Sequence, residues 1–160
     1  MSGFGRECAE IVRAAREGSY KIGMILGSGL GALAEEVEDA VRIPYSHLTE
    51  FPVSTVTSHS SELVAGTLSG VPVVILSGRA HYYEGGDPTV MRTPVETLKE
   101  LGCEILLATN AAGSLRQEVA PGSPMLISDH INWSGMNPLI GEEDEKRFLD
   151  MSTAYDADLR

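Results

Sequence analysis

Apolar residues recur at helical spacing in some parts of the chain and in short continuous runs in others, and the two patterns alternate. Residues 7–16 predict a helix that ends near Gly18. The predicted apolar face of this helix consists of Cys8, Ile11, Val12 and Ala15. Residues 22–26 then form an apolar run with the length of a buried strand.

The next segments predict a small antiparallel part of a sheet. Residues 33–37 predict a short helix, and residues 41–45 an extended segment that Pro44 keeps away from the centre of a sheet. Residues 62–68 and 71–76 flank Ser69-Gly70, a pattern that is typical of a β-hairpin.

The rest of the chain continues the alternation. Residues 89–101 predict an amphipathic helix, residues 104–109 a buried strand and residues 125–131 a further strand, and a last helix could begin near Ser152. The apolar face of the amphipathic helix is expected to hold Val90, Val95, Leu98 and Leu101. We therefore predict an α/β fold with a mixed, largely parallel central sheet flanked by helices.

Composition narrows the class of protein. The 160 residues are 42% hydrophobic and 22% charged, which fits one globular domain, and the net charge is −11. Between positions 17 and 78 the only basic residues are Lys21 and Arg42, so a nucleic-acid binder is disfavoured. The N-terminal residues lack the pattern of a signal peptide, no run is apolar enough for a membrane span, and Cys8 and Cys103 are isolated. We expect a cytoplasmic protein with reduced, buried cysteines.

The apolar run 22–26 ends abruptly at Gly-Ser-Gly-Leu-Gly, residues 27–31. Glycines allow a tight turn and a close approach to a ligand, and successive N–H groups bind anions, so we predict a phosphate site with Ser28 at its edge. The same residues fit a dinucleotide fingerprint, but the long helix and the acid about 20 residues further on are missing. A plain strand-to-helix turn remains the alternative.

Two further strands end in turns that carry polar groups. Residues 78–86 follow the hairpin and contain Arg79 and His81, and Asn-Ala-Ala-Gly follows the strand at 104–109. Ligands of α/β sheets collect at such strand ends, and a guanidinium group suits phosphate. A solvated or ion-paired Arg79 and a surface His59 are the plainer alternatives. The histidines and cysteines have no metal-site spacing.

Five motifs together resemble the homotrimeric class of purine nucleoside phosphorylases. They are GSGLG (27–31), SH (58–59), SGRAHYYEG (77–85), TNAAGSL (109–115) and LISDHIN…NPLIG (126–141). Their order and approximate spacing follow the family from about residue 22 to residue 156. SGRAHYYEG and TNAAGSL together are specific to the family, whereas GSGLG alone is not.

The resemblance implies phosphorolysis of purine ribonucleosides or deoxyribonucleosides to the base and the pentose 1-phosphate, a pentosyl transfer of purine salvage. It implies no cofactor and no metal, since inorganic phosphate is a co-substrate, and it implies a homotrimer. The implied phosphate ligands are Ser28, His59, Arg79 and the N–H group of Ala111. The implied catalytic residue is His81, which also lies at the nucleoside with Tyr83 and with Phe148 from a neighbouring subunit.

Some positions depart from the family pattern. Ala80 replaces a common phenylalanine, Ser58 a glycine, and Ser123-Pro124 the usual Gly-Asp. The resemblance also implies a chain of roughly 270 residues, so we expect residues 1–160 to be one phosphorylase domain that is incomplete at its C-terminal end. The segment that recognises the base would then be missing, and residues 1–160 alone would have little activity. A methylthioadenosine phosphorylase and a non-catalytic phosphate- or nucleoside-binding fragment are the alternatives.

Overall fold

The computed structural model describes residues 3–53, 60–143 and 145–160. These residues belong to two compact units, residues 1–111 and residues 112–160. All five strands lie in the first unit. Among the described residues, no helix is both long and apolar enough to cross a membrane.

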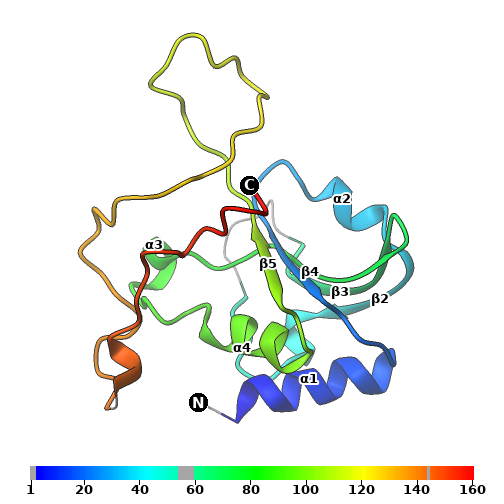
Figure 1. Ribbon diagram of the computed structural model, residues 1–160. Coiled ribbons are helices and arrows are strands. Elements are labelled where there is room, and N and C mark those ends of the chain that lie inside the picture. The colour runs from blue at the N-terminus through cyan, green and yellow to red at the C-terminus, as the bar shows by residue number, and fades with distance from the viewer. Residues whose placement is uncertain (1–2, 54–59, 144) are drawn as a thin grey trace. The chain divides into compact units, whose positions relative to one another are not determined.

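One five-stranded sheet organises the first unit (Figure 1). The strands are β1 (Ile22–Leu26), β2 (Glu38–Pro44), β3 (Glu62–Leu68), β4 (Val71–Ser77) and β5 (Ile105–Ala108). Their order is β2-β3-β4-β1-β5, with β1 parallel to both β4 and β5 and β3 antiparallel to both β2 and β4. The predicted mixed α/β sheet, its hairpin at Ser69-Gly70 and the edge position of the strand with Pro44 are confirmed.

Helices cover the sheet because its central strands are apolar on both faces. Successive side chains of a strand point to opposite faces. Accordingly, Ile25 and Val74 pack in the cluster that includes α1 (Phe4–Ala15) and α4 (Arg92–Glu100), whereas Met24 and Ile75 pack in a second cluster. That second cluster includes Ala34 of the short helix α2 (Ala32–Glu35). Two hydrophobic cores therefore hold the strand ends in register.

The predicted helices differ from the observed ones in detail. Helix α1 begins at Phe4, three residues before the predicted start, and Ala15 is exposed rather than buried. In α4 the buried face includes Thr97, whereas Val95 is 40% exposed. The Thr97 hydroxyl donates to the carbonyl oxygen of Thr93 at 2.8 Å, which satisfies the buried hydroxyl and lets a polar residue replace an apolar one.

Strand β5 forms as predicted, but it is not buried. Leu106 is 51% exposed and Leu107 is 46% exposed. The reason is topological: β5 pairs with β1 on one side, and no further strand follows it within the described residues. An edge strand leaves one row of backbone groups and part of its side chains uncovered.

The second unit consists mainly of turns. The strand predicted for residues 125–131 is absent, and Met125 and Ile131 are 68% and 83% exposed. A strand needs a neighbouring strand to satisfy its backbone, and none is paired with this segment in the described residues. The helix predicted near Ser152 is also absent, because Asp150 Oδ1 accepts hydrogen bonds from the Ser152 N–H and hydroxyl groups and forms a turn instead. The one helical turn described there is η2 (Glu145–Arg147).

Candidate functional site

Three loops follow the carboxyl ends of neighbouring parallel strands, as the sequence predicted. Strands β4, β1 and β5 are parallel neighbours, and their registers place Leu26 beside Ser77 and Ile25 beside Ala108. The segments that follow therefore start side by side: the glycine loop at 27–31, the segment 78–86 and the segment 109–111 (Figure 1). Ligands of α/β proteins commonly bind at the carboxyl ends of such strands.

The glycine loop is fixed to the end of β5 by a close backbone approach. The Gly27 N–H group donates to Thr109 Oγ1 at 2.9 Å. A Cβ atom at Gly27 would lie 2.5 Å from the Thr109 carbonyl oxygen and 2.9 Å from the Cα atom of Asn110. Only glycine fits this position. Ser28, Gly29 and the rest of the loop remain exposed above the sheet edge.

A cavity of about 200 Å³ opens beside this loop. Its lining residues are Leu26, Gly27, Gly29, Gly31, Glu35, Ser60, Ser77 and Gly78. The cavity therefore lies between the ends of β1 and β4, helix α2 and Ser60, which stands two residues before β3. Four of the eight lining residues are glycines and two are serines, residue types whose backbone N–H and hydroxyl groups can bind a small anion, whereas Glu35 adds a carboxylate.

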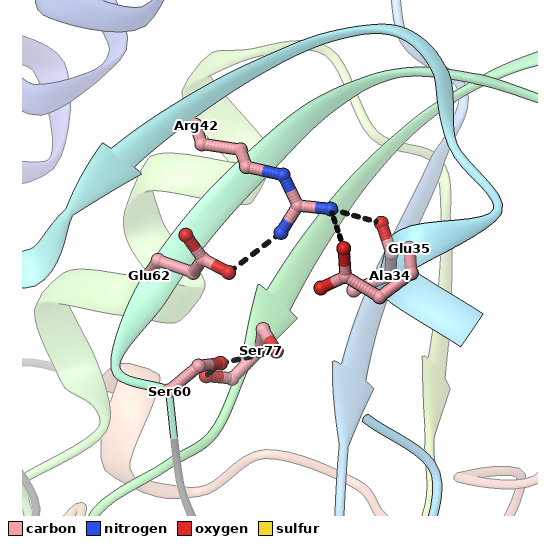
Figure 2. A network of polar contacts seen from close by, with 6 residues as sticks. All are labelled: Ala34, Glu35, Arg42, Ser60, Glu62 and Ser77. Atoms are coloured by element: carbon pink, nitrogen blue, oxygen red, sulfur yellow. Dashed lines mark hydrogen bonds and ion pairs between the residues drawn. The ribbon is translucent and has the colours of Figure 1, made fainter. Parts of the chain in front are cut away.

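Two serines join opposite parts of the lining. Ser60 Oγ donates to the Ser77 carbonyl oxygen at 3.0 Å, and the two hydroxyl oxygens lie 2.6 Å apart (Figure 2). Ser77 is buried, whereas Ser60 is exposed. The contact ties the start of β3 to the end of β4.

Arg79 and His81 follow Ser77 on the segment that leaves β4. Arg79 Nη1 donates to the Thr109 carbonyl oxygen at 2.5 Å, and Arg79 Nε lies 3.4 Å from His81 Nε2. Both side chains are partly buried. Thr109 thus contacts the glycine loop through its hydroxyl and Arg79 through its carbonyl, so one residue connects the three loops.

The orientation of His81 is fixed by its neighbours. Its Nδ1 lies 2.9 Å from Glu84 Oε1, and the same carboxylate accepts the His81 backbone N–H at 2.7 Å. An Nε2 that accepts from Arg79 leaves the proton on Nδ1, where it is donated to Glu84. The Tyr83 ring stacks on the imidazole with centroids 4.8 Å apart and 17° between the planes. These contacts are made by α3 (Tyr82–Gly85), a short helix that begins with a reciprocal cap between residues 81 and 84.

A buried tyrosine supports the start of the same segment. The hydroxyl of Tyr45, which is 2% exposed, donates to the carbonyl oxygen of Gly78 at 2.8 Å. Burial, and secondarily the charge of Glu62, raises the pKa of this hydroxyl, so it remains a donor at any physiological pH. Gly78 has φ 106°, a conformation that favours glycine and turns the chain toward Arg79.

Of the predicted site residues in the first unit, Arg79 and Tyr83 both contact His81 on the segment after β4. Ser28 lies in the glycine loop that follows the neighbouring strand β1. None of these four residues is among those that line the cavity. Ala111 ends that unit and is exposed. His59 lies outside the described residues. Phe148 belongs to the second unit, is 75% exposed, and has the Arg147 guanidinium 4.9 Å from its ring centroid.

Sequence reasoning missed several residues that hold the site. Thr109, Tyr45 and the Ser60–Ser77 pair act through contacts that join distant parts of the chain. Glu84 could have been found, because a polar residue followed three positions later by glutamate is the signature of a helix cap. No group of histidine, cysteine and acidic residues suited to a metal ion occurs within the part of the chain that the structure describes.

A family model described as the phosphorylase superfamily matches residues 21–160. The chain belongs to the phosphorylase superfamily. Its sequence is 52% identical over 144 residues to purine nucleoside phosphorylase 1 of Bacillus subtilis strain 168, covering 88% of this chain and 53% of that relative. The resemblance of the motifs to purine nucleoside phosphorylases is confirmed.

Solved structures of two proteins from Schistosoma mansoni have a similar fold. The structure of isoform 2 of its purine nucleoside phosphorylase in complex with cytosine and ribose-1-phosphate matches with a TM-score of 0.88 and 36% identity, over 99% of this chain and 57% of that one. The structure of its purine nucleoside phosphorylase in complex with inosine matches with a TM-score of 0.87 and 37% identity, over 99% and 58%. The chain spans about half the length of the curated relatives that it matches.

Proposed function

We propose that the whole protein to which these residues belong is a purine nucleoside phosphorylase of purine salvage. It would cleave purine ribonucleosides and deoxyribonucleosides with inorganic phosphate and release the purine base and the pentose 1-phosphate. One observation carries the proposal: in a phosphorylase-superfamily chain, the glycine loop and Arg79 are both bound to Thr109, beside a cavity of about 200 Å³.

The phosphate would be held by uncharged donors and one guanidinium group. We assign this role to Ser28, His59, Arg79 and the N–H group of Ala111. Hydroxyl and backbone N–H donors orient the phosphate oxygens without cancelling their charge, and Arg79 adds a fork that matches two oxygens. A dianion bound in this way remains a nucleophile.

In the reaction a phosphate oxygen forms a bond to C1′ of the pentose while the bond from C1′ to the base nitrogen breaks. Positive charge develops on the sugar as the base leaves with the bonding electrons. A phosphate fixed close to C1′ both attacks that carbon and stabilises its charge. We propose that His81, oriented by Glu84 and stacked on Tyr83, contacts the reacting phosphate and sugar.

The nucleoside side of the site would include Tyr83 and Phe148, and Phe148 would come from a neighbouring copy in a homotrimer. The exposed fractions of Tyr83, 73%, and of Phe148, 75%, agree with side chains that a ligand or a second copy covers. No residue of the 160 is assigned to the base. We therefore propose that a polypeptide of residues 1–160 alone has little activity.

Product analysis tests the proposal. The whole protein is incubated with inosine, with and without phosphate, and hypoxanthine and ribose 1-phosphate are quantified; the same is done with methylthioadenosine. Phosphate-dependent release of hypoxanthine from inosine supports the proposal. Turnover of methylthioadenosine alone would identify the related phosphorylase instead, and phosphate binding without turnover of either nucleoside would indicate a binding protein. The polypeptide 1–160 is assayed in parallel.

A further inference from the structure

Arg42, on β2, contacts residues of α2 and of β3 (Figure 2). Its Nη1 atom lies 2.7 Å from Glu62 Oε1, at the start of β3. Its Nη2 atom lies 2.9 Å from Glu35 Oε2 and 2.8 Å from the carbonyl oxygen of Ala34, both in α2. A guanidinium fork in which two nitrogens bind different partners fixes the distance between those partners.

One ion-pair partner of Arg42 lines the cavity, and the other lies near a lining residue in the sequence. Glu35 lines the cavity itself, and Gly31, which also lines it, immediately precedes α2. Glu62 lies two residues after Ser60, the lining residue that is bonded to Ser77. Arg42 therefore holds the two sides of the opening at a fixed separation, although it is absent from the lining.

The ion pair between Arg42 and Glu35 affects the charge that an anion in the cavity would meet. Of the lining residues, Glu35 carries the one charged side chain among those that the structure describes. An unpaired carboxylate beside the cavity would repel phosphate, and an alternative rotamer could turn it further inward. Pairing with Arg42, which also pairs with Glu62, offsets part of the negative charge of Glu35 and favours one position of its carboxylate.

We infer that Arg42 is a positioning residue that sets the affinity for phosphate, by offsetting part of the charge of Glu35, by holding its side chain and by tying α2 to the start of β3. The inference rests on the proposed function and extends it to a residue that none of the five motifs contains. It also explains why one arginine stands in a stretch, residues 18–78, whose only other basic residue is Lys21.

The test uses Arg42→Gln, Arg42→Lys, Glu35→Gln and the double variant Glu35→Gln/Arg42→Gln, all in the whole protein. Kinetics give KM for phosphate and for inosine separately, and calorimetry gives Kd for inorganic phosphate. Arg6→Gln is the matched control, because Arg6 pairs with Glu100 at 3.7 Å on α1 and does not line the cavity.

Loss of the Arg42 charge is expected to raise KM and Kd for phosphate by roughly three- to tenfold, since partly exposed ion pairs have modest effects, and to change KM for inosine less than about twofold. The Arg42→Lys protein should lie between the wild type and Arg42→Gln. The double variant should recover part of this loss, because Glu35 no longer carries a charge beside the cavity, although Glu62 remains without its partner.

The outcomes separate this inference from the proposed function. Equal phosphate Kd in the wild type and in Arg42→Gln, or a double variant no better than Arg42→Gln, would overturn the role of Arg42, and a fall in melting temperature alone would indicate a structural role. Phosphate binding that depends on Arg42 without any phosphorolysis would refute the proposed function and leave the inference standing. No phosphate binding by the wild type would refute both.

Discussion

Thr109 Oγ1 accepts a hydrogen bond from the Gly27 N–H group at 2.9 Å, across 82 residues of sequence. The same hydroxyl lies 3.3 Å from the Ile25 carbonyl oxygen, to which it donates. Thr109 thus satisfies the backbone at the end of β1, where the strand ladder stops and the glycine loop begins. The loop is held by a side chain of the neighbouring strand end rather than by its own turn alone.

Replacing Thr109 by valine removes this hydroxyl without a large change in volume. The buried Gly27 N–H then lacks its partner, so we expect the free energy of unfolding to fall by about 1–3 kcal/mol. Thr109→Ser retains the hydroxyl and should lose less. Urea unfolding of the whole protein measures both values, and a valine variant as stable as the serine variant would show that the hydrogen bond is unimportant.

Gly27→Ala tests the close approach between the glycine loop and β5. The new Cβ would stand 2.5 Å from a backbone oxygen, so backbone must move, and we expect a loss of roughly 1–3 kcal/mol in the free energy of unfolding. KM for phosphate should rise as well, because the loop is displaced. Gly113→Ala is the control for stability: nothing lies within 4 Å of a Cβ atom at this exposed position, and the free energy of unfolding should change by less than about 0.5 kcal/mol.

Tyr45→Phe tests the hydrogen bond that the Tyr45 hydroxyl donates to Gly78, the residue before Arg79. The Gly78 carbonyl oxygen loses its buried donor, and we expect the free energy of unfolding to fall by about 1–3 kcal/mol. Tyr82→Phe serves as the matched control, since Tyr82 is 43% exposed and should change stability by less than about 0.5 kcal/mol. Equal melting temperatures for the two variants would argue against a role of the buried hydroxyl.

The strand ends could be predicted from sequence because they depend on local patterns. Apolar runs of strand length end at glycine or at small residues, and parallel strands bring such ends to one edge. This reasoning predicts Ser28 and Arg79 on adjacent loops, and the register of β1 with β4 agrees.

The contacts that fix these loops could not be predicted in the same way. Thr109 with Gly27, Tyr45 with Gly78 and Arg42 with Glu62 join residues 20 to 82 positions apart. Such pairings depend on register and on side-chain geometry, which a hydrophobic pattern does not encode. The exposure of β5 and the missing strand at 125–131 have a related cause, because burial and strand formation depend on a neighbour that local sequence does not reveal.

The two cysteines give a prediction about pH. Burial raises the pKa of the Cys103 thiol from 9.0 to about 11, and burial also raises the pKa of Cys8. Between pH 9 and 11 the folded protein keeps a proton on Cys103 that the unfolded chain has lost. Since the folded state then binds more protons, the free energy of unfolding should fall as pH rises through this window, and the contribution is complete below pH 9.

Cys103→Ala should reduce the slope of unfolding free energy against pH between 9 and 11, with Cys8 and Tyr45 responsible for the slope that remains, because their pKa values are raised in the same direction. At pH 8 iodoacetamide should modify Cys103 slowly in the folded protein and rapidly in urea, since the thiolate is the reactive form. Identical slopes for wild type and Cys103→Ala, together with rapid labelling of the folded protein, would mean that the thiol is not protected by burial.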